Sequence, residues 1–85
     1  MELYFTKAFE KDYKKLPSAI QKRLDIQLIA FLQNNRHPSL RIKKMQGHAD
    51  IWEGRVTRQY RFTFQIHGDR YIIRRAGAHA ILSNP

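Results

Sequence analysis

Apolar residues recur with a helical period through the first third of the chain. Phe9, Tyr13 and Leu16 are spaced i, i+4 and i+7, so they predict a helix over residues 7–16 with one apolar side. Thr6 precedes this run and suits the N-cap, because its hydroxyl can accept a backbone N–H of the first turn.

A second helix is predicted after Pro17, which cannot continue the first one. Ser18 followed by Gln21 has the form of a capping box, and the helix is expected to end near Asn34. Its apolar positions form one wide stripe, which consists of Ile20, Leu24, Leu28, Phe31 and Leu32. The two predicted helices form an antiparallel hairpin.

Most of the remaining chain alternates with the period of two that is typical of strands. In residues 60–67 the apolar face consists of Tyr60, Phe62, Phe64 and Ile66, and the polar face of Arg61, Thr63, Gln65 and His67. Further strands are predicted over residues 2–5, 40–44, 51–56 and 70–76. We therefore expect an α+β fold, in which an N-terminal strand and a helix hairpin pack on an antiparallel β-sheet.

The helices should cover the apolar side of this sheet, Ile66 included, and leave the polar side open to solvent. Gly77 frees the chain from the last strand, so residues 78–85 are interpreted as a short tail. An open polar sheet face is a place where a ligand could lie.

The 85 residues have the length of one small domain, which we assign to residues 1–85. The chain has no cysteine, which excludes disulfides and thiolate metal sites and fits a reducing cytoplasm. No apolar run approaches the roughly 18 residues of a membrane span, and no signal peptide is visible. We therefore expect a cytoplasmic protein without a membrane partner.

The net charge of +9 is concentrated in the strand-forming part of the chain. Residues 36–79 hold ten Lys/Arg, three Asp/Glu and all four histidines, whereas the first 35 residues hold six Lys/Arg and four acids. A sheet that carries both guanidinium and imidazole groups suits a polyanion such as a nucleic acid. An acidic inhibitor protein would fit the same surface.

Arg55 and Arg61 lie side by side if their strands pair as a tight hairpin, and two such cations repel unless an anion lies between them. A phosphate is such an anion, because guanidinium groups match its oxygens. His79 follows the last strand and could transfer a proton near neutral pH. The alternative is that each arginine pairs locally with Glu53 or Asp50, and that His79 is an exposed tail residue.

Other basic residues could extend this site to bind RNA; they are Arg41, Lys43, Lys44, His48, Arg74 and Arg75. The lysines could instead protect an edge strand from aggregation. Trp52 could stack on a base, although a lone tryptophan is more often a core residue. The histidines lack regular ligand spacing, so we expect no metal and no other cofactor.

Four segments carry a family resemblance over almost the whole chain: FTKAFEKDYKKLP (residues 5–17), WEGRV (52–56), YRF (60–62) and GAH (77–79). In this order and spacing they resemble the RelE/ParE superfamily of bacterial type II toxin–antitoxin toxins, and more closely its RelE-like mRNA interferases. The resemblance implies a microbial RNase fold with the active site on the concave sheet face. It also implies a ribosome-dependent, metal-free endoribonuclease that cleaves mRNA and forms a complex with a cognate antitoxin.

Carried over to this chain, the resemblance implies that Arg61 stabilises the phosphorane and that His79 is a general acid or base. Arg55 matches a basic position on the preceding strand, and Glu53 or a lysine is the candidate general base. Ala80 stands where many similar sequences have Asp. This keeps open a catalytically decayed module that only binds an antitoxin. The other alternative is a ParE-like inhibitor of DNA gyrase, against which the histidine after Gly77 argues.

Overall fold

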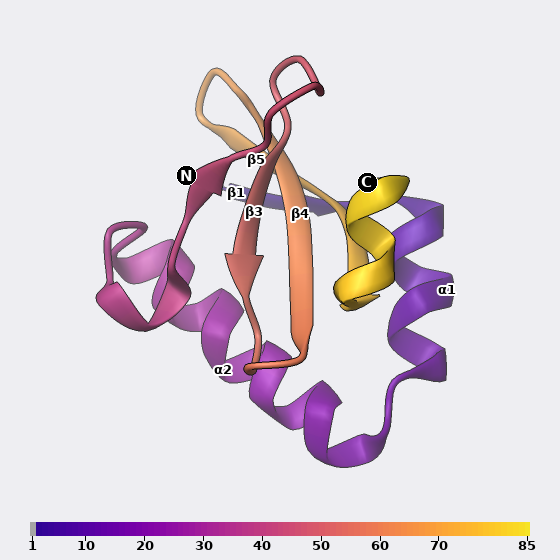
Figure 1. Cartoon of the computed structure of the whole chain (residues 1–85). Helices are drawn as coiled ribbons and strands as arrows, with labels where there is room; N and C mark the ends of the chain where they lie inside the picture. Colours follow the sequence, from indigo (N-terminus) through magenta and orange to yellow (C-terminus); the bar gives the residue numbers. More distant parts are fainter. Residues whose placement is uncertain (1) are drawn as a thin grey trace.

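In the computed structural model, residues 2–85 form a five-stranded sheet with one helix across one of its faces and the other helix beside it (Figure 1). The elements in chain order are β1 (Glu2–Phe5), α1 (Lys7–Lys15), α2 (Ser18–Gln33), the 3-10 helix η1 (Pro38–Leu40), β2 (Lys43–Lys44), β3 (Trp52–Arg55), β4 (Tyr60–His67), β5 (Arg70–Ala78) and the 3-10 helix η2 (His79–Ser83). The predicted α+β class is confirmed. Within residues 2–85, no helix is long and apolar enough to cross a membrane.

The strands are ordered β1-β5-β4-β3-β2, and β4 pairs antiparallel with both β3 and β5. The sheet is mixed, because β1 pairs parallel with β5 at one edge. At the other edge, the strand expected over residues 40–44 shrinks to the two residues of β2. The reason is local: Leu40 belongs to η1, and Arg41 adopts a left-handed conformation with φ 45° that no strand can include.

The core lies between α2 and the sheet, with Phe31 at its centre. The ring centroid of Phe31 lies 5.7 Å from that of Phe62, 4.7 Å from that of Phe64 and 4.2 Å from that of Tyr71. Burying one such aromatic side chain contributes about 1.5–3 kcal/mol. This cluster therefore holds α2 against β4 and β5.

The apolar stripe of α2 differs from the prediction at two positions. Gln27 is 2% exposed, whereas Leu32 is 42% exposed, because position 27 lies between Leu24 and Phe31 on the buried face and position 32 lies at its margin. Ile66 was also expected in the core but is 45% exposed, since the end of β4 extends beyond the side chains of α2 that cover the sheet.

The helix starts were predicted with mixed success. Thr6 is the N-cap of α1, and its hydroxyl accepts the N–H of Phe9 at 3.1 Å. The capping box at Ser18 is wrong: Pro17 occupies the N-cap position, so Ser18 is already helical, and the Gln21 side chain donates to the carbonyl of Tyr13 instead.

Residues 79–85 are not a free tail, and the polar sheet face is only partly open. In Figure 1, η2 lies in front of the sheet while α2 passes behind it. Thr63 is fully buried, and its hydroxyl donates to the main-chain oxygen of Pro85 at 3.2 Å. A Cβ at Gly77 would lie 2.8 Å from the Cγ2 of Ile81, so glycine lets η2 lie close to β5. The open part of this face is therefore the side formed by β3 and β2.

Candidate anion-binding site

The register of β3 and β4 brings the predicted site residues to one face. Arg55 lies directly opposite Arg61, and Glu53 lies opposite Thr63. Lys43 of β2 lies opposite Glu53, so its side chain is directed to the same face. The predicted contact between the two arginines across the hairpin is therefore present.

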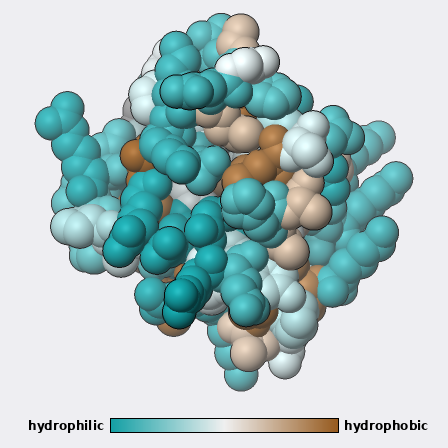
Figure 2. All heavy atoms as spheres, in the orientation of Figure 1, coloured by the Kyte–Doolittle hydropathy of each residue, from teal (hydrophilic) through white to brown (hydrophobic). Residues whose placement is uncertain are grey.

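These side chains surround a depression of about 340 Å³ on the open part of the sheet face. We call it the basic basin; its lining residues are Arg41, Ile42, Lys43, Glu53, Arg55 and Arg61. Figure 2 shows that the side of the molecule seen in Figure 1 is mostly hydrophilic. Four cations and one carboxylate give the basin a positive potential.

Arg55 is the cation of this basin that is both partly buried and without a partner. Its Nε is buried and has no hydrogen-bond partner, and no other side-chain N or O atom of residues 2–85 is in that state. Desolvation, and then the guanidinium groups of Arg41, Arg61 and Arg58, lower the pKa of Arg55. No carboxylate of the described residues lies within 4 Å of it. An anion in the basin would supply the missing acceptor.

Arg61 lines the same basin but is already well bound. Its Nη1 donates to the carbonyls of Thr57 at 2.7 Å, Arg58 at 2.9 Å and Tyr60 at 3.0 Å. Its Nε lies 3.9 Å from Oε1 of Glu53. Arg61 therefore stabilises the connection between β3 and β4, a role that the sequence did not indicate.

Glu53 is 7% exposed, and its Oε1 lies 3.8 Å from Nζ of Lys43, about as far as from Arg61. Both distances exceed those of hydrogen bonds. The local pairing considered as an alternative thus occurs for Arg61, but neither Glu53 nor Asp50 pairs with Arg55.

The arginines of β5 lie outside the basin. Arg75 forms a two-pronged ion pair with Asp12 of α1, at 2.8 Å and 2.9 Å. Burial opposes the charge of Asp12, but the hydrogen bonds from Arg75 and from the N–H of Ala76 outweigh it and lower the pKa of Asp12. Arg74 donates to the main-chain oxygen of Pro85 and to the side chain of Gln65. Neither guanidinium adds to the basin.

The remaining predicted residues are not part of the basin lining. His79 is the exposed first residue of η2, two residues after Gly77, which lies opposite Arg61. Lys44 is directed to the other side of the sheet, because it lies opposite Trp52 rather than Glu53. His48 is half-buried in the β2–β3 loop.

Two residues that support the site were missed at the level of sequence. Gln27 reaches from α2 through the core, and its Nε2 donates to the carbonyl of Arg55 at 2.9 Å and to that of Ser39 at 3.3 Å. A polar residue in the middle of an apolar stripe was the available signal. The other is Arg58, whose carbonyl accepts a hydrogen bond from Arg61 and whose charge acts on Arg55. Among residues 2–85, no group of three His, Asp or Glu residues could hold a metal ion.

The chain is similar to known proteins both in sequence and in fold. The chain is 36% identical over 78 residues to Toxin RelE3 of Methanocaldococcus jannaschii, and the match covers 88% of this chain and 86% of the relative. A RelB-RelE antitoxin-toxin complex from Methanococcus jannaschii superposes with a TM-score of 0.77 and 28% identity, over 95% of both chains. A YoeB/ParE toxin from Agrobacterium tumefaciens shares the fold with a TM-score of 0.78 and 18% identity, over 93% of this chain and 99% of that one. No protein-family model matches the chain.

Proposed function

The chain belongs to the RelE family of toxins of type II toxin–antitoxin systems, and from this premise we propose that it is an endoribonuclease that cleaves mRNA on the ribosome. A cognate antitoxin would hold it inactive, as the antitoxin–toxin complex of its structural relative suggests. The basic basin is the proposed active site.

The observation that carries this proposal is the unpartnered Nε of Arg55 among three other arginines. A buried donor without an acceptor is costly in a folded protein, and like charges around it add to the cost. An RNA phosphate would remove both costs, because its two non-bridging oxygens accept from guanidinium groups and its charge offsets theirs. A metal-free phosphoryl transfer needs such cations in the same place, where the phosphorane develops charge.

In the proposed reaction the 2′-oxygen attacks the adjacent phosphorus and gives its proton to a base. The bond from phosphorus to the 5′-oxygen breaks, and that oxygen takes a proton from an acid, which leaves a 2′,3′-cyclic phosphate and a 5′-hydroxyl. Arg55 and Arg61 stabilise the phosphorane. His79, which is outside the basin lining but follows Gly77 opposite Arg61, is the proposed acid. Glu53 is the candidate base, with Lys43 as the alternative, because both side chains line the basin.

The test is cleavage of a defined mRNA on purified ribosomes, with the 5′ ends mapped by primer extension. Arg55→Met should slow cleavage about 100-fold or more, and His79→Gln about 100-fold to 10,000-fold. Arg23→Met and His67→Gln are the matched controls, because both residues are exposed and lie outside the basin. The controls should stay within about twofold of the parent.

Equal cleavage by Arg55→Met and the parent would contradict the proposed site. Growth arrest without mRNA cleavage, together with inhibited DNA supercoiling in vitro, would instead establish the gyrase inhibitor. Neither arrest nor cleavage, with antitoxin binding retained, would establish the decayed binding module. RNA affinity should also fall steeply as salt rises, because phosphate contacts release counterions, and a flat salt titration would refute phosphate binding.

A further inference from the structure

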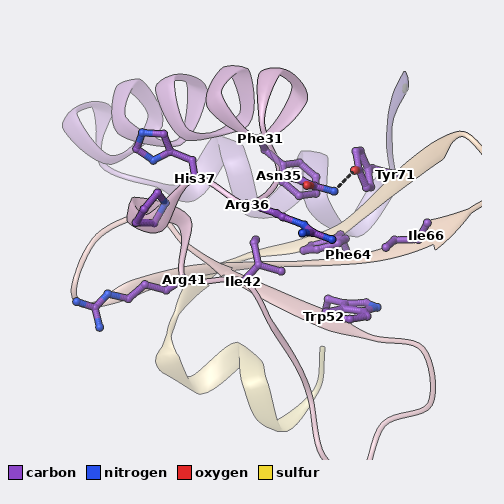
Figure 3. A pocket seen from close by; sticks show the side chains of 11 residues that line it. Phe31, Asn35, Arg36, His37, Arg41, Ile42, Trp52, Phe64, Ile66 and Tyr71 are labelled. Atoms are coloured by element: carbon purple, nitrogen blue, oxygen red, sulfur yellow. Dashed lines mark hydrogen bonds between the residues drawn. The ribbon is translucent and has the colours of Figure 1, made fainter.

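A second and larger cavity lies on the other side of the sheet, where the end of α2 and η1 approach β3 and β4. Its volume is about 530 Å³, within the range of small-molecule sites. We call it the aromatic pocket; the residues that matter below are Asn35, Arg36, Trp52, Phe64, Ile66 and Tyr71 (Figure 3). The proposed phosphate chemistry does not use it.

One part of the pocket wall is aromatic and aliphatic. Trp52 and Phe64 have nearly parallel rings, with centroids 6.4 Å apart and 16° between their planes. Trp52 is only half-buried, and Ile66 is 45% exposed although it belongs to the apolar face of β4. Phe64 is only 1% exposed, so Trp52 supplies the aromatic surface that a ligand can reach. A partly exposed indole next to aliphatic surface is the kind of site on which a planar ring stacks.

The pocket also contains polar groups that can form further hydrogen bonds. Asn35 Nδ2 donates to the hydroxyl oxygen of Tyr71 at 2.8 Å, drawn as a dashed line in Figure 3. This leaves the hydroxyl hydrogen of Tyr71 as a donor and Oδ1 of Asn35 as an acceptor. One donor and one acceptor beside a stacking surface suit the edge of a nucleobase better than a purely apolar ligand.

The charge of the lining favours an anionic ligand. None of the described residues that line the pocket is Asp or Glu. Arg36 points into the pocket toward Phe64 in Figure 3, and it forms no ion pair within residues 2–85. A cation in a pocket with aromatic side chains and no acid to neutralise it fits a ligand that joins a planar ring to a phosphate.

The aromatic pocket adjoins the basic basin at one point. Arg41 and Ile42 line both cavities. The guanidinium of Arg41 points away from the aromatic pocket in Figure 3, and it is one of the charges that act on Arg55. Arg41 and Ile42 immediately precede the edge strand β2, so the two cavities meet at this edge of the sheet.

From this arrangement we propose that the aromatic pocket binds the base of a nucleotide next to the phosphate held in the basic basin, and that it selects among bases. As a specificity site for RNA cleavage the pocket rests on the proposed function. The binding of a nucleotide in the pocket does not depend on the proposed function and can be measured without cleavage.

Trp52 is the single tryptophan of the chain, so intrinsic fluorescence reports directly on this pocket. The probes are the four nucleoside 5′-monophosphates, with ribose 5-phosphate as the ligand that lacks a base. At least one nucleotide should quench Trp52 saturably and bind at least fivefold more tightly than another, and ribose 5-phosphate should leave the fluorescence unchanged. Arg36→Met should weaken that binding about fivefold to tenfold, whereas Arg23→Met should not change it.

Equal responses to ribose 5-phosphate and the nucleotides, or no response to any of them, would overturn the inference. So would quenching only by an acidic protein partner, which would make the pocket a protein-binding site. In the cleavage assay, Ile66→Phe partly fills the pocket and should change the base preference beside the cut. An unchanged preference refutes the specificity role. If the parent cleaves no RNA, the proposed function fails, and the fluorescence titration still decides whether the pocket binds a base.

Discussion

The ion pair between Asp12 and Arg75 joins α1 to β5 across 63 positions of sequence, and its removal gives a quantitative test of what holds the first helix in place. The change to make is Asp12→Asn, which keeps the shape of the side chain and removes its charge. Arg75 then keeps its charge and a contact to the main-chain oxygen of Asn84 but loses its acid.

The loss of unfolding free energy expected for Asp12→Asn follows from the exposure of the two side chains and from the number of hydrogen bonds that they form. The Asp12 and Arg75 side chains are 14% and 28% exposed, so the pair is partly buried. A solvated ion pair contributes at most about 1 kcal/mol, whereas breaking a buried one costs about 3–5 kcal/mol, and the value for this pair should lie between the two. Asp12 accepts two hydrogen bonds from Arg75 and one from the N–H of Ala76. We expect Asp12→Asn to lower the free energy of unfolding by about 2 kcal/mol, which is roughly 8–16 °C in the midpoint for a domain of this size.

The pH dependence has a defined direction. The folded protein lowers the pKa of Asp12 below the value of about 3.9 that it has in an unfolded chain. The pair therefore contributes its full stabilisation above about pH 4 and loses it as the pH falls through the folded-state pKa. The difference in midpoint between the parent and Asp12→Asn should stay constant from pH 7 to pH 5 and narrow at lower pH.

Thermal unfolding followed by circular dichroism measures these quantities. Glu10→Gln is the matched control, because Glu10 is an exposed carboxylate of the same helix and its loss should cost less than about 1 kcal/mol. A midpoint shift below about 3 °C for Asp12→Asn at pH 7 would refute the estimate, and an equally large difference at pH 2.5 would refute its electrostatic origin. Cleavage by Asp12→Asn at a temperature where it is folded should match the parent, since Arg75 lies outside the basin.

Two further predictions concern the basic basin. Arg55→Met should raise the thermal midpoint although it slows cleavage, because it removes an unpartnered donor and its repulsion with three arginines. A lower midpoint would mean that Arg55 is bound within the protein after all. Gln27→Leu should lower the free energy of unfolding by about 1–3 kcal/mol and also slow cleavage, because the carbonyl of Arg55 loses its donor. Unchanged cleavage by the folded variant would show that the hydrogen bond from Gln27 does not position Arg55.

The periodicity of the sequence predicted the elements and the neighbours that depend on local pairing. Residues 60–67 form β4 with the bounds expected from alternation, and the short connection that follows β3 placed Arg55 opposite Arg61. A hairpin with a short connector fixes its register, so this contact follows from the sequence alone.

Contacts between distant segments could not be derived in the same way. Two of these contacts join segments that are far apart in the chain: the pairing of β1 with β5 and the ion pair of Asp12 with Arg75. The third is the position of η2, which depends on its packing against the sheet. Leu32 and Ile66 were placed in the core because alternation and helical spacing identify a face but not where the opposing layer ends. Position along an element, as well as its face, decides burial.

The same limit explains why the sequence could not rank the arginines of the predicted site. Their intrinsic chemistry is identical, and only their surroundings distinguish them. Arg75 is neutralised by Asp12, Arg74 donates to Pro85 and Gln65, and Arg61 holds three carbonyls of a turn. Of the five arginines of the predicted site, Arg55 alone has a buried donor without an acceptor. A folded chain that leaves such a donor without an acceptor is less stable than one that pairs it. Arg55 therefore contributes least to the fold, and its charge is the one most available to a ligand.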